Sequence, residues 1–491
     1  MQPQIRRVGI GLVVAFLAVF LQLNYVQILA AERIADNNAN VRSLLQEYAI
    51  KRGDIITIDG EPVAVSEPTS GRLKYRRTYP GGELYGHITG FYSILYGTSR
   101  IEAAYDDQLL GESGVITMQD VQDRFLGSGL KGDDVRLTIH SQLQAVARES
   151  LGSNRGAVVA LDPDTGDVRA MWSNPSYDPT PLASHDGDVA REYRRSLNPN
   201  SIDSPLVSRS TSRSYPPGST FKIVTTSAAL ESGEYQAQST FPDPQALDLP
   251  LTDDTLTNFS KTACTGTGEI DLFTALTVSC DTTFAILGLD IPEEIQASAE
   301  EYGFNSPIPF DASTEASQVP SVPDDEEPLR AFAGIGQGNV AATPLQMALV
   351  AAGVANGGEV PRPRLVKEVI SPSGEIVDSF PPETIGSPLS AENASAITEM
   401  MVAAVSDPSG TGGAAQLADV SVAGKTGTAQ TVEGTNPHTW FICFAPANDP
   451  QLAVAVIVEN GGTFGSEATG GAVAAPIAKA VLEADRAIQG W

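Results

Sequence analysis

The N-terminal segment is the sequence feature that most limits what this chain can fold into. Arg6 and Arg7 precede an uncharged, largely apolar run from Val8 to Ala31, which is about long enough to cross a bilayer. A cleavable signal peptide has a shorter apolar core and a small-x-small cleavage site, and no clean site of that kind is present. Basic residues beside a membrane span stay in the cytoplasm. We therefore expect a cytoplasmic tail over 1–7, one uncleaved anchor over 8–30, and all later residues outside the membrane.

Charge and cysteine content exclude several classes of function. The chain of 491 residues has 60 acidic and 31 basic residues, for a net charge of -29. Nucleic acid is therefore not expected as a partner, because phosphate binding needs a basic face. Three cysteines without a C-x-x-C pair, and four scattered histidines without H-E-x-x-H, predict neither a metal site nor a cofactor. A histidine-based serine triad is also disfavoured, because the chain has no G-x-S-x-G elbow.

The region after the anchor is expected to form an N-terminal domain over residues 31–150. Residues 54–66, DIITIDGEPVAVS, alternate around an Asp-Gly pair, a pattern typical of a β-hairpin. Residues 79–111 are rich in glycine and tyrosine, and we interpret them as a small extended domain. Residues 127–134, GSGLKGDD, have the composition of a linker.

The remaining residues, 151–491, combine helical patterns with runs of strand residues. The last three strand patterns follow one another closely, which favours an antiparallel meander. Because helices and antiparallel strands segregate, the predicted class is α+β. The helices are expected at 137–151, 219–231, 343–358 and 474–488, and the strands in a hairpin over 156–173 and at 420–430, 439–446 and 452–460.

The first chemical motif is Ser219-x-x-Lys222, in the stretch YPPGSTFKIVT. A serine hydroxyl is a weak nucleophile near neutral pH and needs a base. Residues three apart share a face of a helix, so the Lys222 amine is expected within reach of the Ser219 hydroxyl. Lysine can act as that base only when its pKa is lowered by burial or by a second cation. The first helical turn also offers backbone N–H groups to a developing oxyanion.

The second motif is Lys425-Thr426-Gly427, in the stretch AGKTGTAQ. On an edge strand Lys425 and Thr426 can offer a charge and a hydroxyl to a substrate carboxylate, and Lys425 can be the second cation near Lys222. We expect Gly427 to let the substrate backbone approach closely. Ser-x-x-Lys also occurs at Ser128 and Lys131, in a glycine-rich stretch, which we interpret as a chance match.

A third motif, Ser279-Cys280-Asp281, lies between the other two. In this order the three motifs resemble those of penicillin-binding proteins and serine β-lactamases. Further stretches resemble class B penicillin-binding proteins over nearly the whole chain, most closely the actinobacterial PbpA type. These stretches are 52–55 (RGDI), 100–111 (RIEAAYDDQLLG), 156–179, 334–348 (GIGQGNVAATPLQMA) and 410–415 (GTGGAA).

The resemblance implies a fold and an activity. The fold would be an antiparallel sheet flanked by helices, a transpeptidase domain over 151–491, after an N-terminal dimerisation or pedestal domain over 31–150 and one membrane helix. The activity would be D,D-transpeptidation of peptidoglycan stem peptides, inhibited by β-lactams, at the outer side of the cell membrane. A glycan polymerase of the SEDS type is implied as a membrane partner.

The resemblance also implies a role for each motif residue. Ser219 would attack the carbonyl between two D-alanines, and Lys222 would take its proton. Ser279 would relay a proton to the leaving D-alanine. The terminal carboxylate would be held by Lys425 and Thr426, and the oxyanion by the backbone N–H groups of Ser219 and Thr428.

Asp281 departs from the family pattern, which usually has asparagine at this position. An ionised carboxylate near Lys222 would raise the lysine pKa and weaken the base. Three explanations stay open: Asp281 is protonated, it lies further from Lys222, or the enzyme acylates slowly.

Two of the three cysteines raise a structural alternative. Cys264 lies sixteen residues before Cys280, which is inside the middle motif. Outside the membrane the two can form a disulfide that pins the loop carrying the motif, or they can remain reduced, buried thiols. We expect Cys443 to be an ordinary core residue.

Three rival functions remain from the sequence. A serine β-lactamase needs a deacylating glutamate, which we cannot assign. A D,D-carboxypeptidase would lack the N-terminal region. The rival from another class is a catalytically weak scaffold for division or elongation partners, and Asp281 is the residue that supports it.

Overall fold

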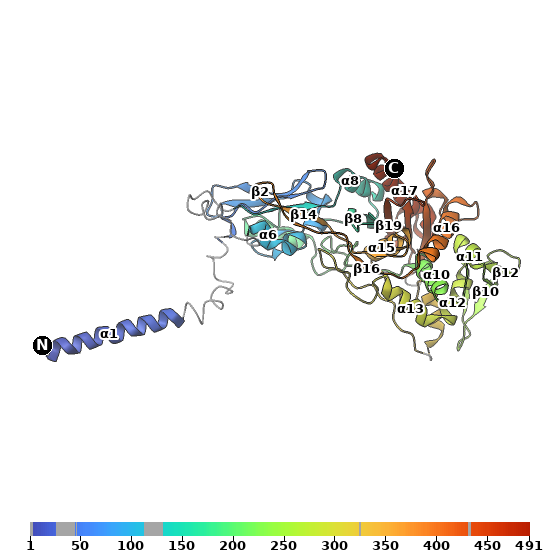
Figure 1. Cartoon of the computed structure of the whole chain (residues 1–491), viewed down its shortest axis with the longest axis horizontal. Coiled ribbons are helices and arrows are strands. Elements are labelled where there is room, and N and C mark those ends of the chain that lie inside the picture. Colours follow the sequence, from blue (N-terminus) through green and yellow to red (C-terminus); the bar gives the residue numbers. More distant parts are fainter. Residues whose placement is uncertain (1–2, 26–44, 46, 112–130, 324–325, 431–433) are drawn as a thin grey trace.

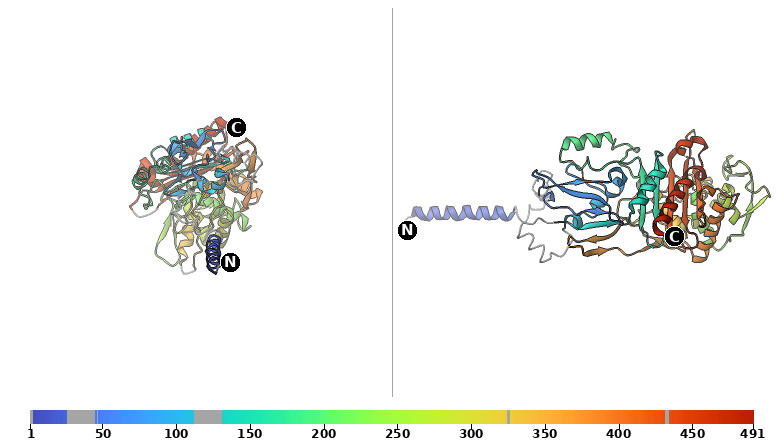
Figure 2. Two further views of the ribbon diagram at one scale, coloured as in Figure 1. Left: turned by 90° about the vertical axis from the view of Figure 1, so that its left-hand side faces the viewer. Right: turned by 90° about the horizontal axis from the view of Figure 1, so that it is seen from above.

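The computed structural model describes residues 3–25, 45, 47–111, 131–323, 326–430 and 434–491. Helix α1 (Pro3–Asn24) is largely exposed, and residues Arg6–Asn24 are long and apolar enough to cross a membrane. This agrees with the start of the expected anchor, whose end lies outside the described residues. Figure 2 shows that the folded body is elongated, with the N-terminal sheet and the C-terminal sheet side by side along it.

A six-stranded sheet forms the core of the N-terminal domain, in the order β15-β14-β6-β1-β2-β3. The expected hairpin is confirmed as the antiparallel pair β1 and β2. Strand β6 begins at Asp134, so the last residue of the expected linker is part of the sheet. The strands are β1 (Ile55–Ile56), β2 (Pro62–Pro68), β3 (Tyr75–Thr78), β6 (Asp134–Leu137), β14 (Val366–Ile370) and β15 (Ile376–Ser379).

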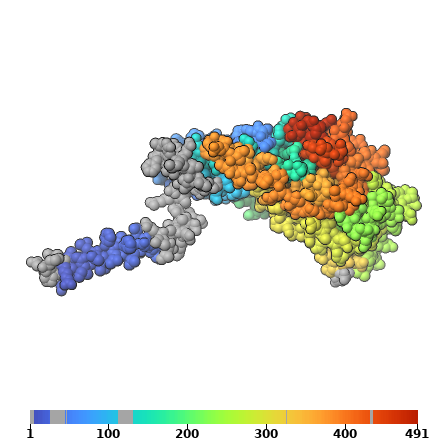
Figure 3. All heavy atoms as spheres, viewed as in Figure 1, coloured from blue at the N-terminus to red at the C-terminus, as the bar shows by residue number. Residues whose placement is uncertain are grey.

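Strands β14 and β15 come from a distant part of the chain. They extend the sheet because β14 pairs antiparallel with β6. Figure 3 shows this segment, in orange, beside the blue residues of the N-terminal domain. Two strands from the expected transpeptidase range 151–491 therefore belong to the N-terminal sheet.

The stretch 79–111 consists mainly of short helices and turns, so the expectation of an extended domain is wrong. Within this stretch Glu102 is fully buried and accepts hydrogen bonds from Arg52 Nε at 2.7 Å and from Arg77 Nε at 2.6 Å. Asp106, 2.6 Å from the Arg52 guanidinium, adds a second carboxylate, so that two guanidinium groups meet two carboxylates. The elements are η2 (Gly82–Leu84), α4 (Gly86–Thr89), β4 (Tyr92–Ser93), β5 (Gly97–Thr98), α5 (Ile101–Ala104) and α6 (Asp106–Leu110).

A five-stranded antiparallel sheet, in the order β17-β18-β19-β7-β8, forms the core of the second domain. Both the expected hairpin, β7 with β8, and the expected meander, β17 to β19, are confirmed. The strands are β7 (Gly156–Leu161), β8 (Val168–Asn174), β17 (Ala423–Ala429), β18 (His438–Ala445) and β19 (Leu452–Val458).

Helices cover both faces of this sheet. On β7, Ala157 and Val159 face one apolar cluster, whereas Val158 and Ala160 face the other. Helices α8 (Ser141–Leu151) and α17 (Ala475–Gln489) pack on one face, and α15 (Pro344–Ala355) packs on the other (Figure 1). Helix α8 therefore belongs to the second domain in space, although it lies within the expected range 31–150.

The described residues form further helices and three further short strand pairs outside the two large sheets. The helices are α9 (Gly187–Ser196), η3 (Gly218–Phe221), α10 (Lys222–Glu231), α11 (Leu272–Val278), α12 (Asp281–Asp290), α13 (Pro292–Glu301), α14 (Pro328–Gly334), α16 (Ala391–Ser406), η5 (Gly413–Ala415), η6 (Glu459–Glu467) and η7 (Gly470–Ala474). Three strand pairs complete the fold: β9 (Thr240–Pro242) with β12 (Glu269–Asp271), β10 (Ala246–Asp248) with β11 (Thr255–Thr257), and β13 (Val360–Pro361) with β16 (Thr384–Gly386).

Candidate active site

Ser219 lies at the start of the predicted helix, in a 3₁₀ turn rather than in the α-helix itself. The turn η3 runs into α10 at Lys222 without a break. Pro216 and Pro217 precede the turn, and each proline disfavours the helical conformation of the residue before it, so the helix does not extend further toward the N-terminus. The Ser219 side chain is half-exposed, and among the described residues its hydroxyl has no hydrogen-bonding partner. It is therefore free to meet a substrate.

Lys222 is fully buried one turn after Ser219. Its Nζ atom donates hydrogen bonds to Asp281 Oδ1 at 2.7 Å and to the backbone oxygen of Ser279 at 2.9 Å, and lies 3.4 Å from Ser279 Oγ. Burial lowers the pKa of Lys222 below the usual lysine value, and the Asp281 carboxylate opposes this shift. A lowered pKa makes it easier for this lysine to be neutral and to accept a proton.

Lys425, the lysine of the second motif, also contacts Ser279. Its Nζ atom donates to Ser279 Oγ at 2.7 Å and to the backbone oxygen of Thr426 at 3.1 Å. Burial lowers the pKa of Lys425 well below the usual value, and the positive charge of Lys222 adds to that effect. The structure thus brings the three motifs together around the Ser279 hydroxyl, as the sequence predicts.

Asp281 lies beside Lys222, which excludes the explanation that it sits further off. It is the first residue of α12, and its second oxygen, Oδ2, accepts a hydrogen bond from the backbone N–H of Phe259 at 3.0 Å. The side-chain oxygen of Asn258 accepts from the backbone N–H groups of Asp281 and Thr282, both at 3.0 Å. Sequence reasoning missed Asn258 and Phe259, since no local pattern connects them to the motif.

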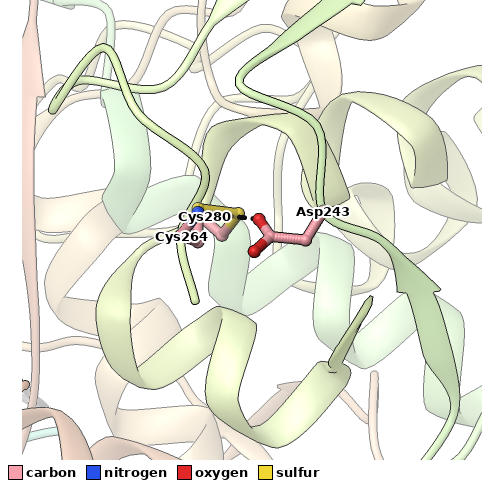
Figure 4. A group of neighbouring side chains, drawn as sticks. All are labelled: Asp243, Cys264 and Cys280. Atoms are coloured by element: carbon pink, nitrogen blue, oxygen red, sulfur yellow. Dashed lines mark hydrogen bonds between the residues drawn. A yellow bond between two sulfur atoms is a disulfide. The ribbon is translucent and has the colours of Figure 1, made fainter. Parts of the chain in front are cut away.

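A disulfide joins Cys264 to Cys280, so the disulfide alternative holds in this structure. It links the loop that carries Phe259 to the motif residues on either side of Cys280. The carboxylate of Asp243 points toward this bridge and accepts hydrogen bonds from the N–H groups of Cys264 and Thr265, each at 2.7 Å (Figure 4). The donor atoms of Asp243, Cys264 and Cys280 lie within 4.8 Å of one another, but the two sulfurs are bonded together and offer no thiolate to a metal.

Gly427 lies close against the segment that carries Ser219. A Cβ atom on Gly427 would lie 2.9 Å from the backbone oxygen of Pro217, 3.0 Å from Thr220 Cγ2 and 3.1 Å from Trp440 Cβ. The missing side chain therefore makes room for the nucleophile segment of the chain itself, and the approach of a substrate backbone at Gly427 stays a prediction. Strand β17 can lie against η3 only because residue 427 is glycine.

The neighbouring threonines occupy alternate positions of β17. Thr426 is hydrogen-bonded through its hydroxyl to the Thr411 hydroxyl at 2.6 Å, and Thr428 is half-buried. Thr411 belongs to the stretch GTGGAA and was not singled out as a site residue. Cys443 is buried in β18, as expected. Ser128, of the chance Ser-x-x-Lys match, lies outside the described residues.

Comparisons with known proteins identify the architecture. Residues 156–483 match the penicillin binding protein transpeptidase domain, and residues 52–135 match the penicillin binding protein A dimerisation domain. The chain is 38% identical to the peptidoglycan D,D-transpeptidase PbpA of Mycolicibacterium smegmatis, over 99% of each chain. It is 36% identical to the PbpA of Mycobacterium tuberculosis, over the full length of both.

A solved structure shows the same fold. The ceftriaxone acyl-enzyme complex of penicillin-binding protein A from M. tuberculosis superposes with a TM-score of 0.84 at 37% identity, covering 90% of this chain and 99% of that one. The match extends over both domains. The chain therefore belongs to the class B penicillin-binding proteins and is a peptidoglycan D,D-transpeptidase of the PbpA type.

Proposed function

We propose that this chain cross-links peptidoglycan stem peptides through an acyl-enzyme on Ser219. The observation that carries the proposal is the hydrogen-bonded group of Lys222, Ser279 and Lys425 beside the first turn that holds Ser219. Such a group can remove a proton from one hydroxyl and deliver it to a leaving amine. The family membership supplies the substrate, because stem peptides end in D-Ala-D-Ala.

The proposed acylation step uses these groups in turn. The Ser219 oxygen attacks the carbonyl carbon between the two D-alanines while its proton passes to neutral Lys222. The N–H groups of Ser219 and Thr428 stabilise the oxyanion. The C–N bond then breaks, and the proton reaches the departing D-alanine nitrogen through Ser279, whose hydroxyl is within 3.4 Å of Lys222 and 2.7 Å of Lys425.

Deacylation completes the transfer. An amine of a second stem peptide attacks the acyl carbon, loses a proton to the same base, and expels the Ser219 oxygen, which regains its proton. Lys425 and Thr426 hold the terminal carboxylate of the donor during acylation. A β-lactam takes the place of D-Ala-D-Ala and leaves Ser219 acylated.

Replacing Asp281 by asparagine should keep or raise the rate of acylation by a β-lactam. The carboxylate raises the pKa of Lys222, so its removal leaves more of the lysine neutral at a given pH. The rise of the acylation rate with pH should therefore move to lower pH. The second-order rate constant of acylation, measured across the neutral range, checks this.

Asp254→Asn is a suitable control for that experiment, because Asp254 is an exposed carboxylate in the turn between β10 and β11. It should leave the pH profile unchanged. A large loss of rate in Asp281→Asn would contradict the prediction and show that the carboxylate itself is required.

Replacing Gly427 by alanine should slow acylation by up to about 100-fold, which is the cost of a shift of roughly 1 Å in a reacting group. The new methyl group cannot lie 2.9 Å from the Pro217 oxygen, so η3 and β17 must move apart. Overpacking of this kind also destabilises a fold by about 1–3 kcal/mol. Stopped-flow acylation and thermal melting measure the two effects.

Gly71→Ala is the matched control, since the nearest atom to a Cβ on Gly71 is 3.8 Å away. It should change neither quantity. Wild-type acylation by Gly427→Ala would mean that the close contact of η3 with β17 does not set the position of the nucleophile.

The test of the proposed function uses the detergent-solubilised full chain. A fluorescent penicillin is added, the protein is digested, and the labelled peptide is identified by mass spectrometry. We expect the label on the peptide that contains Ser219. No label would favour the scaffold function instead. With stem-peptide substrates, a cross-linked product indicates transpeptidation, whereas release of D-alanine alone indicates a D,D-carboxypeptidase.

We further propose that α1 anchors the chain in the cell membrane with the catalytic domain outside, beside a glycan polymerase of the SEDS type. The length and apolar character of Arg6–Asn24 support the anchor, and the family resemblance alone supports the partner. Copurification of the polymerase with the full chain, but not with a chain in which an unrelated membrane helix replaces α1, tests the second proposal.

A further inference from the structure

Glu459, at the end of β19, is a buried carboxylate that the acylation mechanism does not use. Only 4% of its surface is exposed. Its oxygen Oε2 accepts a hydrogen bond from Arg155 Nε at 3.0 Å, and Oε1 accepts from Arg209 Nε at 2.8 Å. Arg213 lies 3.6 Å from Oε1. Three guanidinium groups thus fix the carboxylate in one orientation.

The fourth partner of Glu459 is Tyr215, four residues before Ser219. The Tyr215 hydroxyl donates to Oε1 of Glu459 at 2.7 Å. Its ring meets the rings of His438 and Trp440 edge to face, with centroids 5.4 Å and 6.1 Å away. The tyrosine is therefore fixed at its hydroxyl by the carboxylate and along its ring by β18.

The chain between Tyr215 and Ser219 has little freedom to move independently. Tyr215 exchanges backbone hydrogen bonds with Ala342 at 2.8 and 2.9 Å. The oxygen of Pro216 accepts from Trp440 Nε1 at 2.9 Å, and the N–H of Gly218 donates to Gly336 at 2.9 Å. Two consecutive prolines also restrict the backbone dihedral φ. A displacement of Tyr215 is therefore transmitted to the Ser219 turn.

We propose that Glu459 is a positioning residue for the nucleophile, acting through Tyr215. The carboxylate stands at the end of β19, and Tyr215 connects it to the turn that faces β17. A Cβ on Gly218 would lie 3.0 Å from the Thr428 oxygen, so this turn lies directly against the strand that offers the second oxyanion N–H. The contact sets the distance between the Ser219 and Thr428 N–H groups, which both act on the same oxyanion. The inference rests on the proposed function at Ser219.

The experiment separates binding from reaction in the full chain. Glu459→Gln, Tyr215→Phe and the double variant are made, and the dissociation constant of the non-covalent penicillin complex and its acylation rate constant are measured separately. We expect each single variant to lower the rate constant by about 10- to 100-fold with little change in the dissociation constant. The double variant should be no slower than the worse single variant, because both interrupt the same connection.

Asp485→Asn is the matched control. Asp485 in α17 is also a buried carboxylate, 3.3 Å from Arg169 Nη1 and accepting from Trp491 Nε1 at 2.8 Å, but among the described residues it makes no hydrogen bond or ion pair with the nucleophile segment. It should lower the melting temperature without slowing acylation. A purely structural role for Glu459 would give the same result in Glu459→Gln, a lower melting temperature with a wild-type rate constant, and would overturn the proposal.

Tyr215→Phe keeps the proposal testable if Glu459→Gln fails to fold, because it removes one hydroxyl and leaves the arginine partners of Glu459 in place. A wild-type rate constant in Tyr215→Phe would also overturn the proposal. Failure of the proposed function has a different signature, since the wild-type chain would then carry no label on the Ser219 peptide.

Discussion

Replacing Ser219 by alanine should abolish the covalent capture of penicillin by this chain. The acyl group needs an oxygen nucleophile beside a neutral base, and Ser219 is the hydroxyl that precedes buried Lys222 by one turn. The half-exposed side chain makes no hydrogen bond among the described residues, so its loss should change the free energy of unfolding by less than about 0.5 kcal/mol. Fluorescence of the denatured protein after gel separation measures the covalent label.

Ser128→Ala is an informative control, because Ser128 and Lys131 repeat the Ser-x-x-Lys spacing elsewhere in the chain. It should bind penicillin covalently like the unaltered protein. Label that persists in Ser219→Ala would show a different nucleophile, and the peptide that carries the label would then identify it.

The meeting of the three motifs was predictable from their order along the chain and from the resemblance to penicillin-binding proteins, since Ser-x-x-Lys alone also occurs by chance at Ser128 and Lys131. Ser-x-x-Lys at the start of a helix, Lys-Thr-Gly on a strand, and a serine motif between them indicate one active site before any contact is known. Their convergence on the Ser279 hydroxyl is what that hypothesis requires. The hairpin over β7 and β8 was equally accessible, since its turn and its two strands are adjacent in sequence.

The close contact of Gly427 with η3 was not predictable from the sequence. Residues of a strand alternate between two faces, and the pattern of β17 does not tell which face meets the substrate and which meets η3. Strands β14 and β15 were missed for a related reason. The pairing of β14 with β6 joins residues more than two hundred positions apart, and no local pattern names the partner of a distant strand.

The structure excludes one of the three explanations for Asp281, namely that it lies further from Lys222. The sequence raised the conflict between a carboxylate and a lysine base, and the structure shows the two in contact at 2.7 Å. It also shows what holds the carboxylate: Lys222 on one oxygen and the Phe259 N–H on the other, in a loop tied down by the disulfide. This is an arrangement of the tertiary fold that spacing alone does not reveal.

Replacing Lys222 by arginine should slow acylation about as much as replacing it by alanine, by about 10²- to 10⁴-fold. Arginine keeps the positive charge and can still donate to Asp281 and Ser279, but it does not lose a proton in a protein. The comparison therefore separates a base from a cation. The second-order rate constant for penicillin should rise with pH in the unaltered protein as Lys222 becomes neutral, and should not follow this rise in either variant.

Lys367→Arg is the control for a lysine-to-arginine replacement outside the active site. Lys367 also donates to a carboxylate, Asp167 Oδ2, at 2.9 Å. It lies on β14, in the N-terminal sheet, and belongs to none of the three motifs. Its replacement should leave acylation unchanged. If Lys222→Arg reacts like the unaltered protein while Lys222→Ala does not, then Lys222 serves as a charge, and the proton of Ser219 must go to another group. Lys425 is then the candidate base, because burial and the charge of Lys222 already lower its pKa.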